Sequence, residues 1–187
     1  MFMTDKELQK TEAAITDYVS VAFKIAAAAI FAALVAAATL LFVIPIPATS
    51  GYFNLGETLI YIAALLFGPF VGAIAGAGAT IADALVAAQY APGTFTIKAI
   101  EGFLVGFLYK KLVHKTKSIT LSATIAIVVG GFEMVLGYFL YETLILGSTV
   151  AILEVPFNIV QMLIGLIIAV PVMHAILRVF PLLKSQF

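Results

Sequence analysis

The chain has 187 residues, of which 63% are hydrophobic and only 11% are charged. A water-soluble domain of this size does not bury so much apolar side chain, which excludes a soluble enzyme. The formal net charge is zero and the sequence has no cysteine, so neither a basic nucleic-acid surface nor thiol chemistry is available. We therefore expect an all-α integral membrane protein.

The length of the chain predicts about six membrane spans, because a bilayer core about 30 Å thick takes about 20 apolar residues per helix. Residues 1–18 are polar and predict a short amphipathic segment at the cytoplasmic interface. Residues 19–180 form the expected membrane domain, a six-transmembrane-helix bundle, and residues 181–187 a cytoplasmic tail. We place the spans at Val19–Ile44, Asn54–Phe67, Phe70–Val86, Phe95–Lys111, Ile119–Tyr141 and Pro156–Arg178.

Proline and glycine set the ends of these spans. Pro45 and Pro47 end the first, and a loop over Ala48–Phe53 follows. The Gly68-Pro69 pair predicts a tight turn, and the segment Gln89–Thr94 predicts the next connection. Pro156 is expected to open the sixth helix, because proline is favoured in a first turn.

The charged residues predict the orientation of the bundle. In the six-span arrangement one side collects almost all basic residues: Lys6, Lys10, Lys24, Lys110, Lys111, Lys115, Lys117, Arg178 and Lys184. By the positive-inside rule this side is cytoplasmic, so we expect a multi-pass protein of the cell membrane with both termini inside. The other side carries one basic residue, Lys98, and five acids. The acids are Glu57, Asp83, Glu101, Glu142 and Glu154.

Small residues recur at helical spacing on three spans, where they allow backbones to approach closely. The third span carries Gly68-Gly72-Gly76-Thr80 and the fourth Gly102-Gly106, which predicts internal packing faces. The first span carries two alanine rows. We interpret this alanine strip either as internal packing or as a docking face for another membrane protein: Ala28, Ala29, Ala32, Ala33, Ala36 and Ala37.

Polar residues concentrate in the outer halves of the predicted spans, which predicts a polar cavity open to the outside. Tyrosine and phenylalanine gather at the same end, as an interfacial belt or as a stacking surface for a planar ligand. We expect the substrate-binding residues to be Tyr52, Asn54, Glu57, Lys98, Glu101, Glu133, Asn158 and Gln161.

Each polar group also has a purely structural interpretation. Asn54 and Glu57 have the spacing of a helix-capping pair. Lys98 has Glu101 and Glu133 as candidate ion-pair partners, and Glu133 could instead be neutral and hydrogen-bonded. Glu154 precedes Pro156 and so could be a helix-start acid. Two carboxamides in hydrocarbon are harder to explain structurally, so for Asn158 and Gln161 we favour ligand contact.

The sequence offers no catalytic constellation. His114 and His174 are expected at the cytoplasmic side, away from Ser122 and Ser148 in depth, and no carboxylate cluster accompanies them. We therefore expect no catalytic residues, no metal site and no cofactor.

The alanine-rich first span and four sequence strings together resemble a known family. The strings are Gly51-Tyr52-Phe53-Asn54-Leu55-Gly56-Glu57, Leu65-Leu66-Phe67-Gly68-Pro69-Phe70-Val71-Gly72-Ala73, Ile97-Lys98-Ala99-Ile100-Glu101-Gly102 and Pro156-Phe157-Asn158-Ile159-Val160-Gln161. A chain with these features resembles the substrate-binding S component of an energy-coupling factor (ECF) vitamin transporter, in the group of riboflavin and hydroxymethylpyrimidine carriers.

The resemblance implies a subunit that captures a small heteroaromatic vitamin from outside, in a pocket formed by the loop after the first span and helices four to six. It implies a T component and two ATP-binding-cassette ATPases as partners, with the alanine face meeting the T component. Riboflavin is favoured. Gln161 stands where riboflavin carriers have a lysine, and a glutamine can serve a pyrimidine or a flavin edge, so hydroxymethylpyrimidine, a thiamin precursor, and pyridoxine-type compounds come next. The alternative is an autonomous proton-coupled transporter, which would need ionisable residues accessible from both sides.

Overall fold

The computed structural model describes residues 5–46, 49, 51–181 and 183. Within this part of the chain six helices form the molecule, in the order α1 to α6, with two short strands between α1 and α2. The helices are α1 (Asp5–Leu41), α2 (Gly56–Phe67), α3 (Pro69–Val86), α4 (Ala91–Thr116), α5 (Ile119–Ile145) and α6 (Ser148–Val179). Apart from the two short strands, the described residues thus confirm the all-α prediction.

Four of these helices have stretches long and apolar enough to cross a membrane: Val19–Leu41, Pro69–Val86, Ile119–Ile145 and Ser148–Val179. Helix α4 has 26 residues but is interrupted by charged side chains. Helix α2 has only 12 residues, about 18 Å of helix, which is shorter than a bilayer core about 30 Å thick. The number of helices matches our expectation, whereas six full-length spans are not confirmed.

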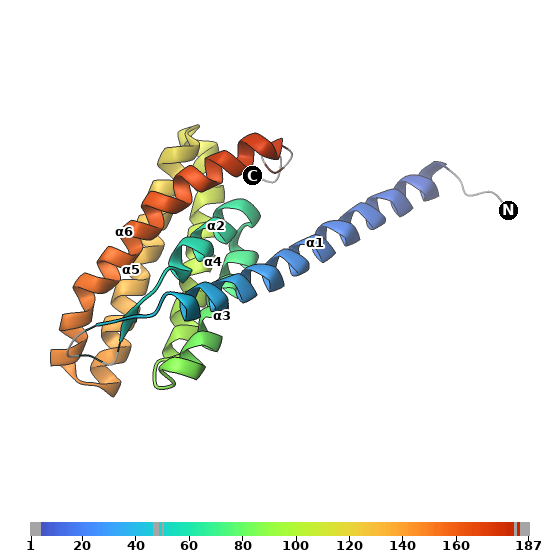
Figure 1. Cartoon of the computed structure of the whole chain (residues 1–187). Coiled ribbons are helices and arrows are strands. Elements are labelled where there is room, and N and C mark those ends of the chain that lie inside the picture. Colours follow the sequence, from blue (N-terminus) through green and yellow to red (C-terminus); the bar gives the residue numbers. More distant parts are fainter. Residues whose placement is uncertain (1–4, 47–48, 50, 182, 184–187) are drawn as a thin grey trace.

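The first helix is longer than we predicted. Helix α1 runs without interruption from Asp5 to Leu41, so the segment expected as separate within residues 1–18 continues directly into the first span. Its N-terminal half projects away from the other helices (Figure 1). An interfacial location for that half stays a prediction, and residues 1–4 lie outside the described part of the chain.

A short β-hairpin replaces the loop expected after the first span. Strands β1 (Ile44–Pro45) and β2 (Tyr52–Phe53) pair antiparallel, with Ile44 opposite Phe53. Ala48 and Ser50 of the predicted loop, and Pro47 just before it, lie outside the described residues. The hairpin lies at the end of the bundle where α5 ends and α6 begins (Figure 1).

Two helix starts differ from our expectations. Helix α4 begins at Ala91 and includes the Pro92-Gly93 pair, because proline in a first turn gives up no helical hydrogen bond. Helix α6 begins at Ser148, so Pro156 lies inside it. Prolines within membrane helices are tolerated where neighbouring groups satisfy the freed backbone. Glu154 is therefore not a helix-start acid.

The predicted glycine rows form the contact between α3 and α4. A Cβ built on Gly72 would lie 2.3 Å from the carbonyl oxygen of Gly102, and one on Gly76 would lie 1.9 Å from that of Lys98. The turn before α3 also requires glycine, because Gly68 has φ +90°. These backbones approach so closely that larger side chains would separate the helices, which confirms the internal packing interpretation.

The alanine strip of α1 divides into two faces. Ala28 and Ala36 are buried and Ala32 is half-buried against α3, where a Cβ on Gly78 would lie 2.4 Å from the Ala32 carbonyl oxygen. The second row is exposed along its whole length: Ala29, Ala33 and Ala37. One row thus packs within the chain and one remains open.

The short helix α2 is the core of the bundle. It contacts α1, α3, α4 and α6, and its side chains are buried along most of its length. Leu65 and Tyr61, for example, are fully buried in the apolar cluster that α2 shares with α4, α5 and α6. Such a helix need not face lipid, which explains why it can be short.

Candidate functional site

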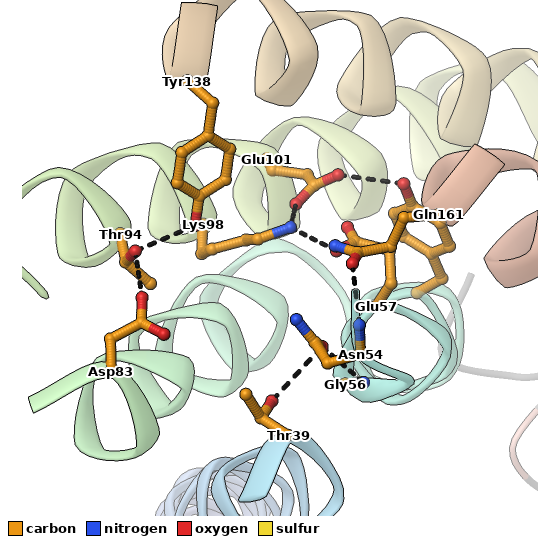
Figure 2. A network of polar contacts seen from close by, with 11 residues as sticks. Thr39, Asn54, Gly56, Glu57, Asp83, Thr94, Lys98, Glu101, Tyr138 and Gln161 are labelled. Carbon is orange, nitrogen blue, oxygen red and sulfur yellow. Dashed lines mark hydrogen bonds and ion pairs between the residues drawn. The ribbon is translucent and has the colours of Figure 1, made fainter. Parts of the chain in front are cut away.

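A buried ion-pair network joins α2 and α4. The ammonium of Lys98 on α4 lies between the carboxylates of Glu57 on α2 and Glu101 on its own helix (Figure 2). It contacts Glu57 Oε2 directly, and its Nζ lies 3.2 Å from Glu101 Oε2. All three residues are at most 3% exposed. Mutual pairing compensates for charges that would otherwise be costly inside a membrane protein.

Hydrogen bonds extend this network to α6 and to the loop before α2. Gln161 Nε2 donates to Glu57 Oε2 over 3.0 Å, and Gln161 Oε1 accepts from the Asn54 backbone N–H over 3.1 Å (Figure 2). Tyr61 donates to Glu101 Oε1 over 2.9 Å. Gln161 thus connects the hairpin loop, α2 and α6 through one carboxamide, which has both a donor and an acceptor.

The capping interpretation of Glu57 is wrong. The Glu57 side chain binds Lys98 and Gln161 and makes no cap hydrogen bond, while Leu55 occupies the N-cap position of α2. Asn54 does act locally, because its Oδ1 accepts the backbone N–H of Gly56 over 2.9 Å. The two residues of this capping-type sequence therefore have different roles. Asn54 makes a local turn contact, and Glu57 forms a long-range ion pair.

A second polar group fixes the hairpin. Asp83 near the end of α3 accepts hydrogen bonds from the Tyr52 hydroxyl on β2 and the Thr94 hydroxyl on α4. Burial and the Asp83 charge raise the pKa of the Tyr52 phenol, so this hydroxyl stays protonated and donates. The Thr94 hydroxyl lies 2.9 Å from that of Tyr138, whose ring centre is 5.5 Å from Lys98 Nζ (Figure 2). The two networks thereby meet at Tyr138.

A pocket of about 360 Å³, including the space open to solvent, lies at this end of the molecule. The hairpin, the loop after α3, and helices α3, α5 and α6 contribute its walls. It is lined by Gly51, Tyr52, Asn54, Asp83, Tyr90, Tyr138, Glu142, Glu154, Asn158 and Gln161.

Our eight predicted site residues divide into three groups in the structure. Four of them line the pocket: Tyr52, Asn54, Asn158 and Gln161. Glu57, Lys98 and Glu101 form the buried network and are not among the lining residues. Glu133 on α5 is half-buried, does not line the pocket, and forms no ion pair with Lys98 in the described structure. Any contact of these groups with a ligand stays a prediction.

Several lining residues were not in our predicted site: Gly51, Asp83, Tyr90, Tyr138, Glu142 and Glu154. The sequence placed the acids and tyrosines at the same outer end, which was the available signal. We did not predict Glu154 as a site residue, because a sixth helix that starts at Pro156 would leave Glu154 in a loop. In the structure Glu142 lies near the end of α5 and Glu154 near the start of α6, and both line the pocket.

Fold and site together define a class: a small helical membrane protein with a polar pocket at one end, over a buried ion-pair network. Comparison with known sequences identifies the family. Residues 20–178 match the family described as "ECF-type riboflavin transporter, S component". The chain belongs to this family of transporter subunits, which is not an enzyme family.

A curated relative is similar in sequence, and its description names no activity. The chain is 38% identical over 131 residues to a Pyrococcus woesei protein described as "Uncharacterized protein in gap 3'region". The alignment covers 70% of this chain and 85% of that protein.

Proposed function

We propose that this chain is the substrate-binding subunit of an ECF-type importer and that its ligand is riboflavin. The pocket binds the vitamin on the extracytoplasmic side, and a T component with two ATP-binding-cassette ATPases drives uptake. Hydroxymethylpyrimidine and pyridoxine-type compounds follow riboflavin as candidate ligands. The observation that carries the proposal is a pocket lined by tyrosines and amides in a chain of this family.

The chemistry of the lining residues supports a heteroaromatic ligand. Tyr52, Tyr90 and Tyr138 supply aromatic surface, and Asn158 and Gln161 supply amide donors and acceptors for ring edges. The buried network beneath the pocket holds α2, α4 and α6 in fixed relative positions, which keeps the lining residues preorganised.

Orientation also supports capture from outside. The pocket lies at the end of the bundle that carries the hairpin, while Lys24, Lys110 and Gly68 lie together at the opposite end. The positive-inside rule assigns the lysine-rich end to the cytoplasm.

Ligand identity is tested first by mass spectrometry of small molecules released from the purified chain. We expect riboflavin to be released, and titration of the emptied protein with riboflavin to quench flavin fluorescence at a stoichiometry of one. Uptake into vesicles should require the T component, both ATPases and ATP. Uptake by the chain alone, driven by a proton gradient, would instead establish the autonomous transporter.

A further inference from the structure

Among the described residues, two buried acids in the pocket wall have no positive partner. Glu142 near the end of α5 and Glu154 near the start of α6 lie on either side of the turn at Gly147, and both line the pocket. Each is 2% exposed, and one carboxylate oxygen of each accepts no hydrogen bond from the described part of the chain.

Two further side chains in the same wall have unused hydrogen-bonding groups. Tyr90 is 5% exposed, lines the pocket, and its hydroxyl has no hydrogen-bond partner among the described residues. Asn158, one turn along α6 from Glu154, is half-buried and also lines the pocket, and its Nδ2 has no hydrogen-bond partner among the described residues. Buried polar groups in proteins are hydrogen-bonded almost without exception, so an incomplete set in a pocket wall points to a ligand.

Positive charge is missing from this wall. Among the described residues that line the pocket none is basic. Lys98, the nearest ammonium, lies between Glu57 and Glu101 beneath the pocket and is fully used there (Figure 2). The free groups are therefore two carboxylates, one phenol and one amide N–H.

We infer that this acidic wall, formed by Glu142 and Glu154, determines specificity: it accepts hydrogen bonds from the hydroxyl or N–H groups of an uncharged ligand and excludes the phosphorylated form of the same compound. The inference rests on the proposed function and extends it to the charge state of the vitamin. Carboxyl groups accept hydrogen bonds from neutral donors, whereas the phosphate would add an anion to a poorly hydrated wall in which no described lining residue supplies a cation.

The first test compares riboflavin with riboflavin 5′-phosphate on the purified full chain in detergent, by flavin fluorescence quenching. We expect riboflavin to bind at least about 100-fold more tightly, a difference of about 2.8 kcal/mol. Equal affinities would overturn the inference and leave the proposed function intact. A chain that binds neither flavin would overturn the riboflavin assignment and this inference with it.

The second test neutralises the wall with the isosteric double variant Glu142→Gln/Glu154→Gln. We expect the preference for riboflavin over its phosphate to fall at least tenfold, chiefly because the phosphate binds better. Asp17→Asn, in the half of α1 that projects from the bundle, removes a negative charge elsewhere and should leave the preference unchanged (Figure 1). A preference that survives in the double variant contradicts the assignment. If the double variant does not fold, the wild-type comparison still decides, and the single variants locate the effect.

Discussion

At the scale of single residues, Lys98 has the largest structural role in the site. Its ammonium is the positive centre between two buried carboxylates, and its side chain is 3% exposed. Removing one member of such a group leaves an uncompensated charge in a low-dielectric environment. The network is therefore expected to depend on Lys98 more strongly than on any hydrogen bond around it.

Replacing Lys98 by methionine should destabilise the protein severely, by about 3–5 kcal/mol, because Glu57 and Glu101 would face each other without a cation. Thermal unfolding of the purified protein in detergent measures this change. Lys115→Met, at an exposed position near the end of α4, is the matched control and should unfold like wild type. Wild-type stability of the Lys98 variant would show that the ion pairs contribute nothing.

The two carboxamides of α6, which our sequence analysis treated alike, have different surroundings. Gln161 is hydrogen-bonded on both sides, to Glu57 and to the Asn54 backbone, whereas Nδ2 of Asn158 has no partner among the described residues. Both line the pocket. Asn158 is thus free to bind a ligand, and Gln161 has a structural role as well.

Asn158→Leu should weaken riboflavin binding at least tenfold, about 1.4 kcal/mol, with little change in unfolding temperature. Gln161→Leu should lower both affinity and stability, because it leaves Glu57 and the Asn54 N–H without their partner. Titration and thermal unfolding of the same preparations separate the two effects. Unchanged affinity in the Asn158 variant would remove this residue from the binding site.

At the scale of elements, α1 shows how one alanine-rich helix provides two surfaces. The Ala28 row packs against α3, with Ala32 beside Gly78, and the Ala29 row is exposed. Small side chains on an exposed membrane helix allow another helix to approach closely. Docking of the T component therefore stays a prediction for the exposed row, while the inner row is already occupied.

Ala33→Trp, on the exposed row, should spare folding and riboflavin binding but prevent co-purification with a T component, because the indole would hold the helices apart. Ala32→Trp is the contrasting variant. Its side chain would enter the α1–α3 contact beside Gly78, so it should destabilise the chain itself. An intact complex with the Ala33 variant would show that this row does not dock the partner.

At the scale of the whole molecule, the two ends of the bundle differ chemically. The hairpin, the acidic wall and the pocket lie at one end, and the exposed lysines near the end of α4 lie at the other. This asymmetry is what a capture subunit open to one side requires. It also makes the orientation in the membrane directly measurable.

The natural sequence has no cysteine, so single cysteines can be introduced without further changes. Ser148→Cys, exposed at the first residue of α6, should react with a membrane-impermeant maleimide in intact cells. Lys115→Cys should react only after lysis, because we expect the lysine-rich end to be cytoplasmic. The reverse labelling pattern would place the pocket inside.

Local sequence was sufficient for the helical class, the Gly68-Pro69 turn and the glycine rows, because proline, glycine and apolar runs act within a few residues. Local sequence was insufficient where one pattern is compatible with two different structures. The sequence from Asn54 to Glu57 fits a helix cap, yet Glu57 pairs with Lys98, which is 41 residues away along the chain. Similarly, a proline suits either a helix start or a helix interior in a membrane, and only packing decided for Pro156.

The sequence by itself determined that this protein is a helical membrane protein with its polar chemistry at one end, because hydropathy and charge act on each helix separately. Only the tertiary structure decided which polar groups pair with one another and which remain free in the pocket. Burying a charge requires a partner, and that partner comes from whichever helix packs alongside. Lys98 was thereby assigned to the buried network, and Glu142 and Glu154 to the pocket wall.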